Sequence, residues 1–179
     1  MNNDIKEILF TKEEIDRMVV KIGKKISEDY KGKTLMLVCV LKGANMFMSD
    51  LMKAIDIPVE IDFISASSYG HSTVSSGVVK FLKDVDSSVE NKHIILVEDL
   101  VDTGLTLKYL LKNFRNRDAI SVEACTLLDK PERRTADVLV KYKGFNIPDE
   151  FIVGYGIDYA EKYRNLPYIA TLKPEVYGE

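Results

Sequence analysis

The sequence predicts an α/β protein in which a mostly parallel, twisted β-sheet is flanked by helices. Two runs, residues 34–41 and 93–97, have strand length and are almost free of polar residues, as are strands covered on both faces. Segments in which apolar residues recur at helical spacing alternate with such runs along the chain. This alternation of strands and helices is typical of a parallel sheet with helices on its faces.

The elements follow from local patterns in chain order. Thr11 and Glu14 have the spacing of a capping box, and helical spacing of apolar residues continues until about Gly32. Two further helices are expected over residues 46–55 and 105–114. Strands are expected over residues 34–41, 59–66, 78–83, 93–97, 121–128, 138–142, 151–155 and 169–172. Because ligands bind beyond the carboxyl ends of the strands in such sheets, we expect the functional site there.

Length and composition predict one globular domain and exclude several classes of function. The chain has 179 residues, with 25 Lys and Arg against 28 Asp and Glu and a formal net charge of −3, which argues against a nucleic-acid partner. The longest apolar run, residues 35–41, is far shorter than the ~18 residues of a membrane span. Cys39 and Cys125 lie in apolar runs and are expected to be small buried hydrophobic residues. We therefore expect a reduced, cytoplasmic protein without a membrane partner.

The most informative segment is residues 94–106, where an apolar strand meets three carboxylates and a Thr-Gly-Leu-Thr turn opens a helix. The backbone N–H groups and hydroxyls of this turn, beside the positive end of the helix dipole, form a phosphate cradle. The segment lacks the spacing and the lysine of a P-loop. Glu98 and Asp99 can accept hydrogen bonds from a ribose diol or hold Mg²⁺, directly or through water. The alternative is an acidic strand end at which Asp102 or Thr103 caps the helix.

This segment resembles the ribose-phosphate-binding signature of the phosphoribosyltransferases, in the V-E-D-x-x-D-T-G-x-T form of the bacterial 6-oxopurine (hypoxanthine-guanine) enzymes. Other segments resemble the same family. Residues 41–43 resemble its pyrophosphate loop, residues 67–70 resemble the start of its lid, and residues 163–167 resemble its C-terminal portion. Residues 127–131 and 148–159 resemble its purine-binding segments. The resemblance implies a type I phosphoribosyltransferase fold as a single domain over residues 1–179. It also implies a small hood formed by the N- and C-terminal segments and a mobile lid over about residues 67–77.

The implied activity is purine salvage. A ring nitrogen of the base displaces pyrophosphate from C1 of 5-phosphoribosyl 1-pyrophosphate (PRPP), which gives IMP or GMP. The implied partners are PRPP and the 6-oxopurines hypoxanthine, guanine or xanthine, with Mg²⁺ as cofactor and a homodimer or homotetramer as the assembly. The preference among the bases stays open, because backbone groups and loop shape decide which group is accepted at purine position 2.

The resemblance also assigns roles to individual residues. The 5′-phosphate and ribose would contact Glu98, Asp99, Asp102, Thr103, Gly104, Leu105 and Thr106. Pyrophosphate would contact Lys42, Gly43, Ser68, Tyr69 and Arg164, and the purine would contact Lys130, Phe151, Ile152 and Asp158. Glu98 and Asp99 would hold one Mg²⁺, and Asp158 would bind a second Mg²⁺ with PRPP oxygens completing its shell. Asp102 would also be the general base for the proton on purine N7. Lys130 can only donate, so it suits an oxygen at purine position 6. In the family, the peptide bond before the lysine that corresponds to Lys42 is often cis.

Each of these residues also has a plain structural interpretation. Lys42 and Gly43 could form an ordinary turn, Lys130 and Arg164 could be surface charges, and residues 151–152 could belong to the core. The charge runs at residues 24–25 and 132–134 are expected on the solvated surface. Two rival functions are a PRPP- or nucleotide-sensing regulator and a phosphoribosyltransferase for a pyrimidine. The presence of Asp102, Lys130, Arg164 and the lid segment favours catalysis on a purine.

Overall fold

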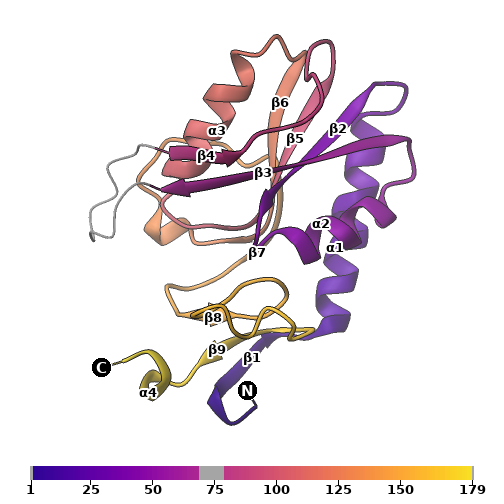
Figure 1. Ribbon diagram of the computed structural model, residues 1–179. Helices are drawn as coiled ribbons and strands as arrows, with labels where there is room; N and C mark the ends of the chain where they lie inside the picture. The colour runs from indigo at the N-terminus through magenta and orange to yellow at the C-terminus, as the bar shows by residue number, and fades with distance from the viewer. Residues whose placement is uncertain (1, 69–78, 179) are drawn as a thin grey trace.

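The computed structural model describes residues 2–68 and 79–178 and contains two β-sheets (Figure 1). Its helices and strands are β1 (Ile5–Phe10), α1 (Lys12–Asp29), β2 (Leu35–Leu41), α2 (Asn45–Ala54), β3 (Val59–Ser68), β4 (Val79–Lys83), β5 (His93–Val101), α3 (Leu105–Arg115), β6 (Ser121–Asp129), β7 (Tyr142–Asn146), β8 (Ile152–Val153), β9 (Ile169–Leu172) and α4 (Pro174–Tyr177). The larger sheet has the order β4-β3-β2-β5-β6-β7, and only β4 runs antiparallel to its neighbour. The predicted fold class is confirmed.

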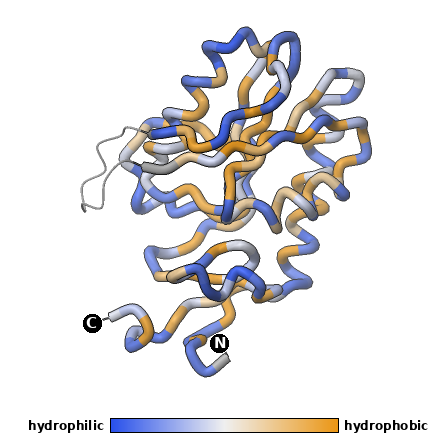
Figure 2. The backbone as a smooth tube through the Cα atoms, viewed as in Figure 1, coloured by the Kyte–Doolittle hydropathy of each residue, from blue (hydrophilic) through white to orange (hydrophobic). Residues whose placement is uncertain are grey.

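The core lies on both faces of the larger sheet. In β2, Leu35, Leu37 and Cys39 pack against α1 and α2, whereas Met36 and Val38 pack against α3 on the other face. The sequence therefore reads as a continuous apolar run, because every side chain of the strand is covered. Hydrophobic colouring runs along these central strands in Figure 2. Cys39 and Cys125 are buried and free, as predicted.

Helix α1 begins and ends where its sequence predicts. The Thr11 hydroxyl accepts from the Glu14 N–H at 3.3 Å, and the Glu14 carboxylate accepts from the Thr11 N–H at 2.9 Å, which completes the capping box. The helix packs closely on α2 through Gly23, where a Cβ atom would lie 2.6 Å from the carbonyl oxygen of Ala54.

Three predicted strand boundaries are wrong. Residues 138–141 are not a strand: Val138 and Val140 pack partly against the α3 side of the core, which produces the alternation, but pairing with β6 begins only at Tyr142. Strand β5 does not stop before the acidic residues but continues to Val101, and the strand predicted over residues 151–155 contains only Ile152–Val153. Strand β1 and helix α4 were not predicted.

The smaller sheet, with the order β1-β9-β8, joins segments from both ends of the chain. Both of its pairings are antiparallel. In Figure 1 it lies below the larger sheet, beyond the carboxyl ends of β2, β5 and β6. Within the described residues, no helix is long and apolar enough to cross a membrane. The arrangement leaves a site between the carboxyl edge of one sheet and the face of another.

Candidate active site

The main pocket lies between the two sheets and has a volume of about 570 Å³. Leu100, Asp102 and Lys130 line it from the ends of β5 and β6, and Phe151 and Asp158 line it from the opposite side. Four of these five residues were predicted as site residues from the sequence. Their side chains come together because parallel strands end at the same edge of a sheet.

Two adjacent carboxylates at the end of β5 are held in a dry environment. Burial raises the pKa of both Glu98 and Asp99, and for Asp99 the Leu100 N–H and Arg164 oppose part of this rise. The loop after β2 crosses directly over Asp99: a Cβ atom on Gly43 would lie 1.8 Å from the Asp99 Oδ2 atom. Only glycine allows this approach. The peptide bond between Leu41 and Lys42 is cis, as the family pattern implied.

The turn after β5 forms a second, smaller pocket of about 120 Å³ beside Glu98 and Thr106. Gly104 precedes the first residue of α3, with a φ of 80°, and no side chain caps this helix. The Thr103 hydroxyl accepts only a long bond of 3.4 Å from the Leu105 N–H. Asp102 and Thr103 are therefore not the helix cap, so the alternative interpretation of this segment is wrong. Apart from this long bond from Leu105, the first N–H groups of α3 remain available to an anion.

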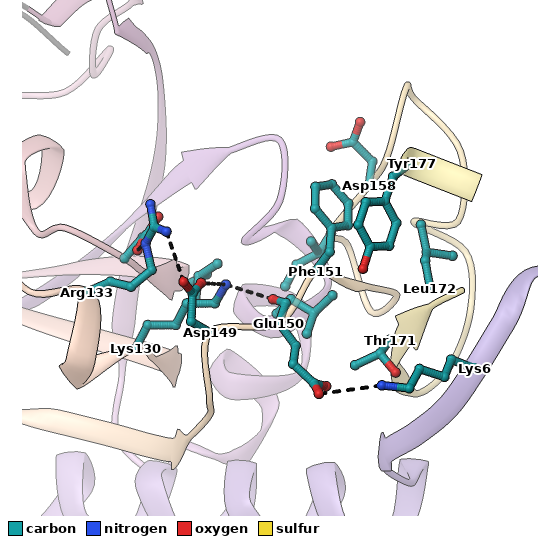
Figure 3. A pocket seen from close by; sticks show the side chains of 14 residues that line it. Lys6, Lys130, Arg133, Asp149, Glu150, Phe151, Asp158, Thr171, Leu172 and Tyr177 are labelled. Atoms are coloured by element: carbon teal, nitrogen blue, oxygen red, sulfur yellow. Dashed lines mark hydrogen bonds and ion pairs between the residues drawn. The ribbon is translucent and has the colours of Figure 1, made fainter. Parts of the chain in front are cut away.

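Asp102 instead belongs to a chain of four charged side chains. The other three, Arg133, Asp149 and Lys130, are labelled in Figure 3. The Nε atom of Arg133 donates to Asp102 at 2.9 Å, and its Nη1 atom donates to Asp149 at 3.0 Å. The other oxygen of Asp149 accepts from Lys130 at 3.3 Å, and Lys130 also donates to the Glu150 carbonyl at 2.8 Å. The four charges sum to zero, and all four side chains line the main pocket.

Sequence reasoning missed Arg133 and Asp149 as site residues. It placed residues 132–134 on the solvated surface, which holds for Glu132 and Arg133 but is wrong for Arg134, whose side chain is only 18% exposed. Arg133 contacts Asp102, and Arg134 pairs with the buried Asp129 and donates to the Asp102 carbonyl at 3.2 Å. The sequence offered one weak signal, because two arginines, Arg133 and Arg134, lie shortly after Asp129, where β6 ends. The surface-charge interpretation of Lys130 is also wrong, since only 10% of its side chain is exposed.

Phe151 and Ile152, both predicted to contact the purine, differ in how far they are buried. Ile152 is buried in the core, but 40% of Phe151 is exposed although its ring lines the main pocket. The core interpretation therefore holds for Ile152 and is wrong for Phe151. A large aromatic side chain exposed at a pocket is suited to stack on a flat ligand.

The cations predicted to bind pyrophosphate meet at one carboxylate. Glu161 accepts from Lys42 at 3.1 Å and from Arg164 at 3.3 Å. Arg164 also pairs with Asp158 at 2.8 Å and donates to the Gly156 carbonyl at 2.8 Å, so it is not an isolated surface charge. Its Nε atom is buried without a partner in the described part of the chain. The Ser68 side chain, Tyr69 and most of the predicted lid lie outside the described residues.

The acidic residues fit a divalent cation that is bound mainly by its substrate. Among residues 2–68 and 79–178, no group of three His, Cys, Asp or Glu side chains could hold a metal ion. Glu98 and Asp99 supply two carboxylates whose negative charge is disfavoured by burial, and a cation would offset that cost. Mg²⁺ is usually bound by one or two carboxylates together with substrate phosphates, which is the donor set that this site offers.

Comparisons with known proteins agree with this geometry. The chain matches the family model of the phosphoribosyl transferase domain over residues 6–160. It is 53% identical over 178 residues to a hypoxanthine-guanine phosphoribosyltransferase of Staphylococcus aureus, covering 99% of each chain. It is 52% identical over 177 residues to that of Bacillus subtilis, covering 99% of this chain and 98% of the relative. A crystal structure of a hypoxanthine phosphoribosyltransferase from Staphylococcus aureus superposes with a TM-score of 0.98 at 52% identity, covering 100% of this chain and 97% of that one. The chain therefore belongs to the phosphoribosyltransferase family of transferases, in its hypoxanthine-guanine branch.

Proposed function

We propose that this chain transfers the 5-phosphoribosyl group from PRPP to hypoxanthine and guanine, giving IMP and GMP with release of pyrophosphate. The observation that carries the proposal is the main pocket, which holds a buried lysine donor and an aspartate acceptor on one side of an exposed aromatic ring. A flat base on Phe151 could meet Lys130 and Asp102 together. The names of the relatives support the same reaction.

Lys130 would select the base. Its ammonium group donates to two oxygens in the pocket, and its only capacity is to donate. It therefore suits the 6-oxygen of hypoxanthine, guanine or xanthine, whereas the 6-amino group of adenine would leave a nearly buried charge facing a donor. Such a mismatch is costly, because it leaves buried polar groups unpaired. Ile152 would offer backbone groups to the edge of the base.

Asp102 would accept the proton from purine N7 as a ring nitrogen forms its bond to C1 of PRPP. The electrons of the breaking C1–oxygen bond leave with pyrophosphate. One Asp102 oxygen accepts from Arg133 at 2.9 Å, and the other accepts no hydrogen bond within the described part of the chain and can face the base. The turn of residues 102–106 would hold the 5′-phosphate, and Lys42, Gly43, Ser68, Tyr69 and Arg164 would hold the pyrophosphate.

Glu98 and Asp99 would hold Mg²⁺ and the ribose hydroxyls, and Asp158 would bind a second Mg²⁺ together with oxygens of PRPP. Bound Mg²⁺ would neutralise part of the negative charge that develops on pyrophosphate. The relatives are consistent with a divalent cation. From the family resemblance we further propose that residues 1–179 act as one domain, with a lid over about residues 67–77, as a cytoplasmic homodimer or homotetramer. Size-exclusion chromatography with light scattering would measure the assembly.

The test is PRPP-dependent nucleotide formation with Mg²⁺, with hypoxanthine, guanine, xanthine, adenine and uracil assayed side by side. We expect turnover of hypoxanthine and guanine and none of adenine or uracil. Binding of PRPP without conversion of any base would favour the sensing regulator, and turnover of uracil would favour the pyrimidine enzyme. Either result would refute the proposal.

A variant tests the role of Asp102. Asp102→Asn should lower kcat by about 10²- to 10⁴-fold, the range for loss of a general base, and should leave the affinity for PRPP nearly unchanged. Asp56→Asn is the matched control, because Asp56 is exposed and lies outside both pockets. Full activity of Asp102→Asn would exclude Asp102 as the base.

A further inference from the structure

The exposed ring of Phe151 is held by two tyrosines, of which Tyr177 lies outside every motif that the sequence analysis named. The Tyr177 ring stacks on it, with a centroid distance of 4.9 Å and an interplanar angle of 18°. The Tyr159 ring meets it edge-on, at 5.2 Å and 89°. Stacked and edge-to-face pairs are the two arrangements that aromatic quadrupoles favour. Phe151 is therefore fixed in orientation although much of it is exposed.

Tyr177 reaches this position because the end of the chain is fastened to the smaller sheet. The Lys173 N–H donates to the Asp4 carbonyl at 2.9 Å, directly before α4 begins at Pro174. Val176 in α4 packs on a cluster of buried residues that includes Val153 and Leu172. These contacts set the direction in which the next residue, Tyr177, projects.

Tyr177 covers one face of Phe151, and Tyr159, the edge-to-face partner, does not line the main pocket. In Figure 3 the Phe151 ring lies between the Tyr177 ring and the side chains of Lys130 and Arg133. Tyr177 itself lines the main pocket at its far end. A flat base that meets Lys130 would therefore contact the Phe151 face opposite Tyr177, and three rings would lie in one stack.

We propose that Tyr177 is a positioning residue for the purine: it supports Phe151 from behind and so holds the stacking face parallel to the incoming base. This inference rests on the proposed function, because it assigns the base to that face. The support comes from the C-terminal four-residue helix α4, which makes the last turn of the chain part of the base site. The site for PRPP lies on the other side of Asp102 and does not depend on Tyr177.

The test compares ligand affinities of the full-length protein by calorimetry. Tyr177→Ala should weaken IMP binding by about three- to tenfold, the range expected for loss of one aromatic pair, and should leave PRPP binding within about twofold. In steady state the same variant should raise the KM for hypoxanthine and leave kcat nearly unchanged. Tyr177→Phe should restore wild-type affinity, because it keeps the ring. Glu175→Ala, an exposed change in the same helix, should have no effect.

Every other result would refute either the role of Tyr177 or the proposed function. Equal IMP affinity for wild type and Tyr177→Ala would refute the role of Tyr177 alone. Equal loss of IMP and PRPP binding would show a general disturbance of the site and would also refute it. Tyr177→Leu provides a second variant that keeps an apolar contact, and wild-type behaviour of this variant would exclude a requirement for the ring. A wild-type protein that binds neither IMP nor GMP would instead overturn the proposed function.

Discussion

Replacing Gly43 by alanine should lower the activity of the site much more than the stability of the fold. The new Cβ atom would lie 1.8 Å from Oδ2 of Asp99 and 2.6 Å from its Cγ. Because real Cβ contacts are essentially never shorter than 3.0 Å, the two groups must move apart by about 1.2 Å, from 1.8 to 3.0 Å. Either the carboxylate leaves its place beside Glu98, or the loop that follows β2 lifts away.

The size of the effect follows from that displacement. A misplacement of ~1 Å in a reacting assembly costs about 100-fold in rate, which corresponds to ~2.7 kcal/mol of transition-state stabilisation. We therefore expect kcat/KM for PRPP and hypoxanthine to fall about 100-fold in Gly43→Ala. The free energy of unfolding should fall by only ~1–3 kcal/mol, as for other insertions of a methyl group into a packed site. Steady-state kinetics and urea unfolding measure the two quantities.

Two comparisons make this reasoning refutable. Gly32→Ala places a methyl group where nothing lies within 4 Å, at a residue with a φ of 75°, so it should lower stability without affecting turnover. Asp99→Ala removes the group that the methyl would strike, so adding Gly43→Ala to this variant should cost no more than about a further twofold. Wild-type kcat/KM for Gly43→Ala would refute the steric argument. Multiplication of the two losses in the double variant would show that Gly43 does not act through Asp99.

Three further outcomes follow from individual contacts. Lys130→Gln should lower kcat/KM for hypoxanthine by about 100-fold or more and leave PRPP affinity unchanged, which calorimetry can check; equal loss of both would contradict base recognition. Glu161→Gln frees Lys42 and Arg164 from a competing anion, so the Kd for pyrophosphate should fall by about two- to fivefold, and a rise would exclude the competition. Burial and two nearby lysines lower the pKa of His93 from 6.5, so the unfolded chain takes up the proton first. Stability should therefore be complete above pH 6.5 and decline as the pH falls below it, and His93→Gln should remove this decline in urea unfolding curves.

The elements that the sequence predicted well are those whose cause is local. A capping box contains both of its partners within residues 11–14, and β2 is recognisable because both of its faces are covered. The segment 138–141 failed for the opposite reason. Its alternating burial comes from packing beneath α3, and no strand within the described residues pairs with it. Strand β1 was missed because it pairs with β9, more than 150 residues later in the chain.

The same distinction applies to the site. The turn of residues 102–106 was predicted because its carboxylate, hydroxyls and glycine are adjacent in the sequence. Arg133 and Asp149 were not, since each acts through a partner at least 16 residues away. Tyr177 lies in a segment without any motif, and only the attachment of α4 to the smaller sheet brings it to Phe151. Contacts between distant segments depend on the fold, and a pattern in one segment does not contain them.

Several charged groups at the two ends of the site already have partners within the protein, and this affects how affinity is determined. Arg133 occupies an oxygen of Asp102, and Glu161 occupies both Lys42 and Arg164. Lys130 is only 10% exposed and needs a partner within the protein, whereas the exposed pair of Lys42 and Glu161 contributes little to stability. Purine and pyrophosphate must therefore replace protein partners at both ends of the site, and each contributes only the difference between the new contact and the old one. Weakening an internal partner should then strengthen ligand binding, whereas weakening a ligand contact should reduce it. Glu161→Gln and Lys130→Gln test these opposite signs at the two ends of the same site.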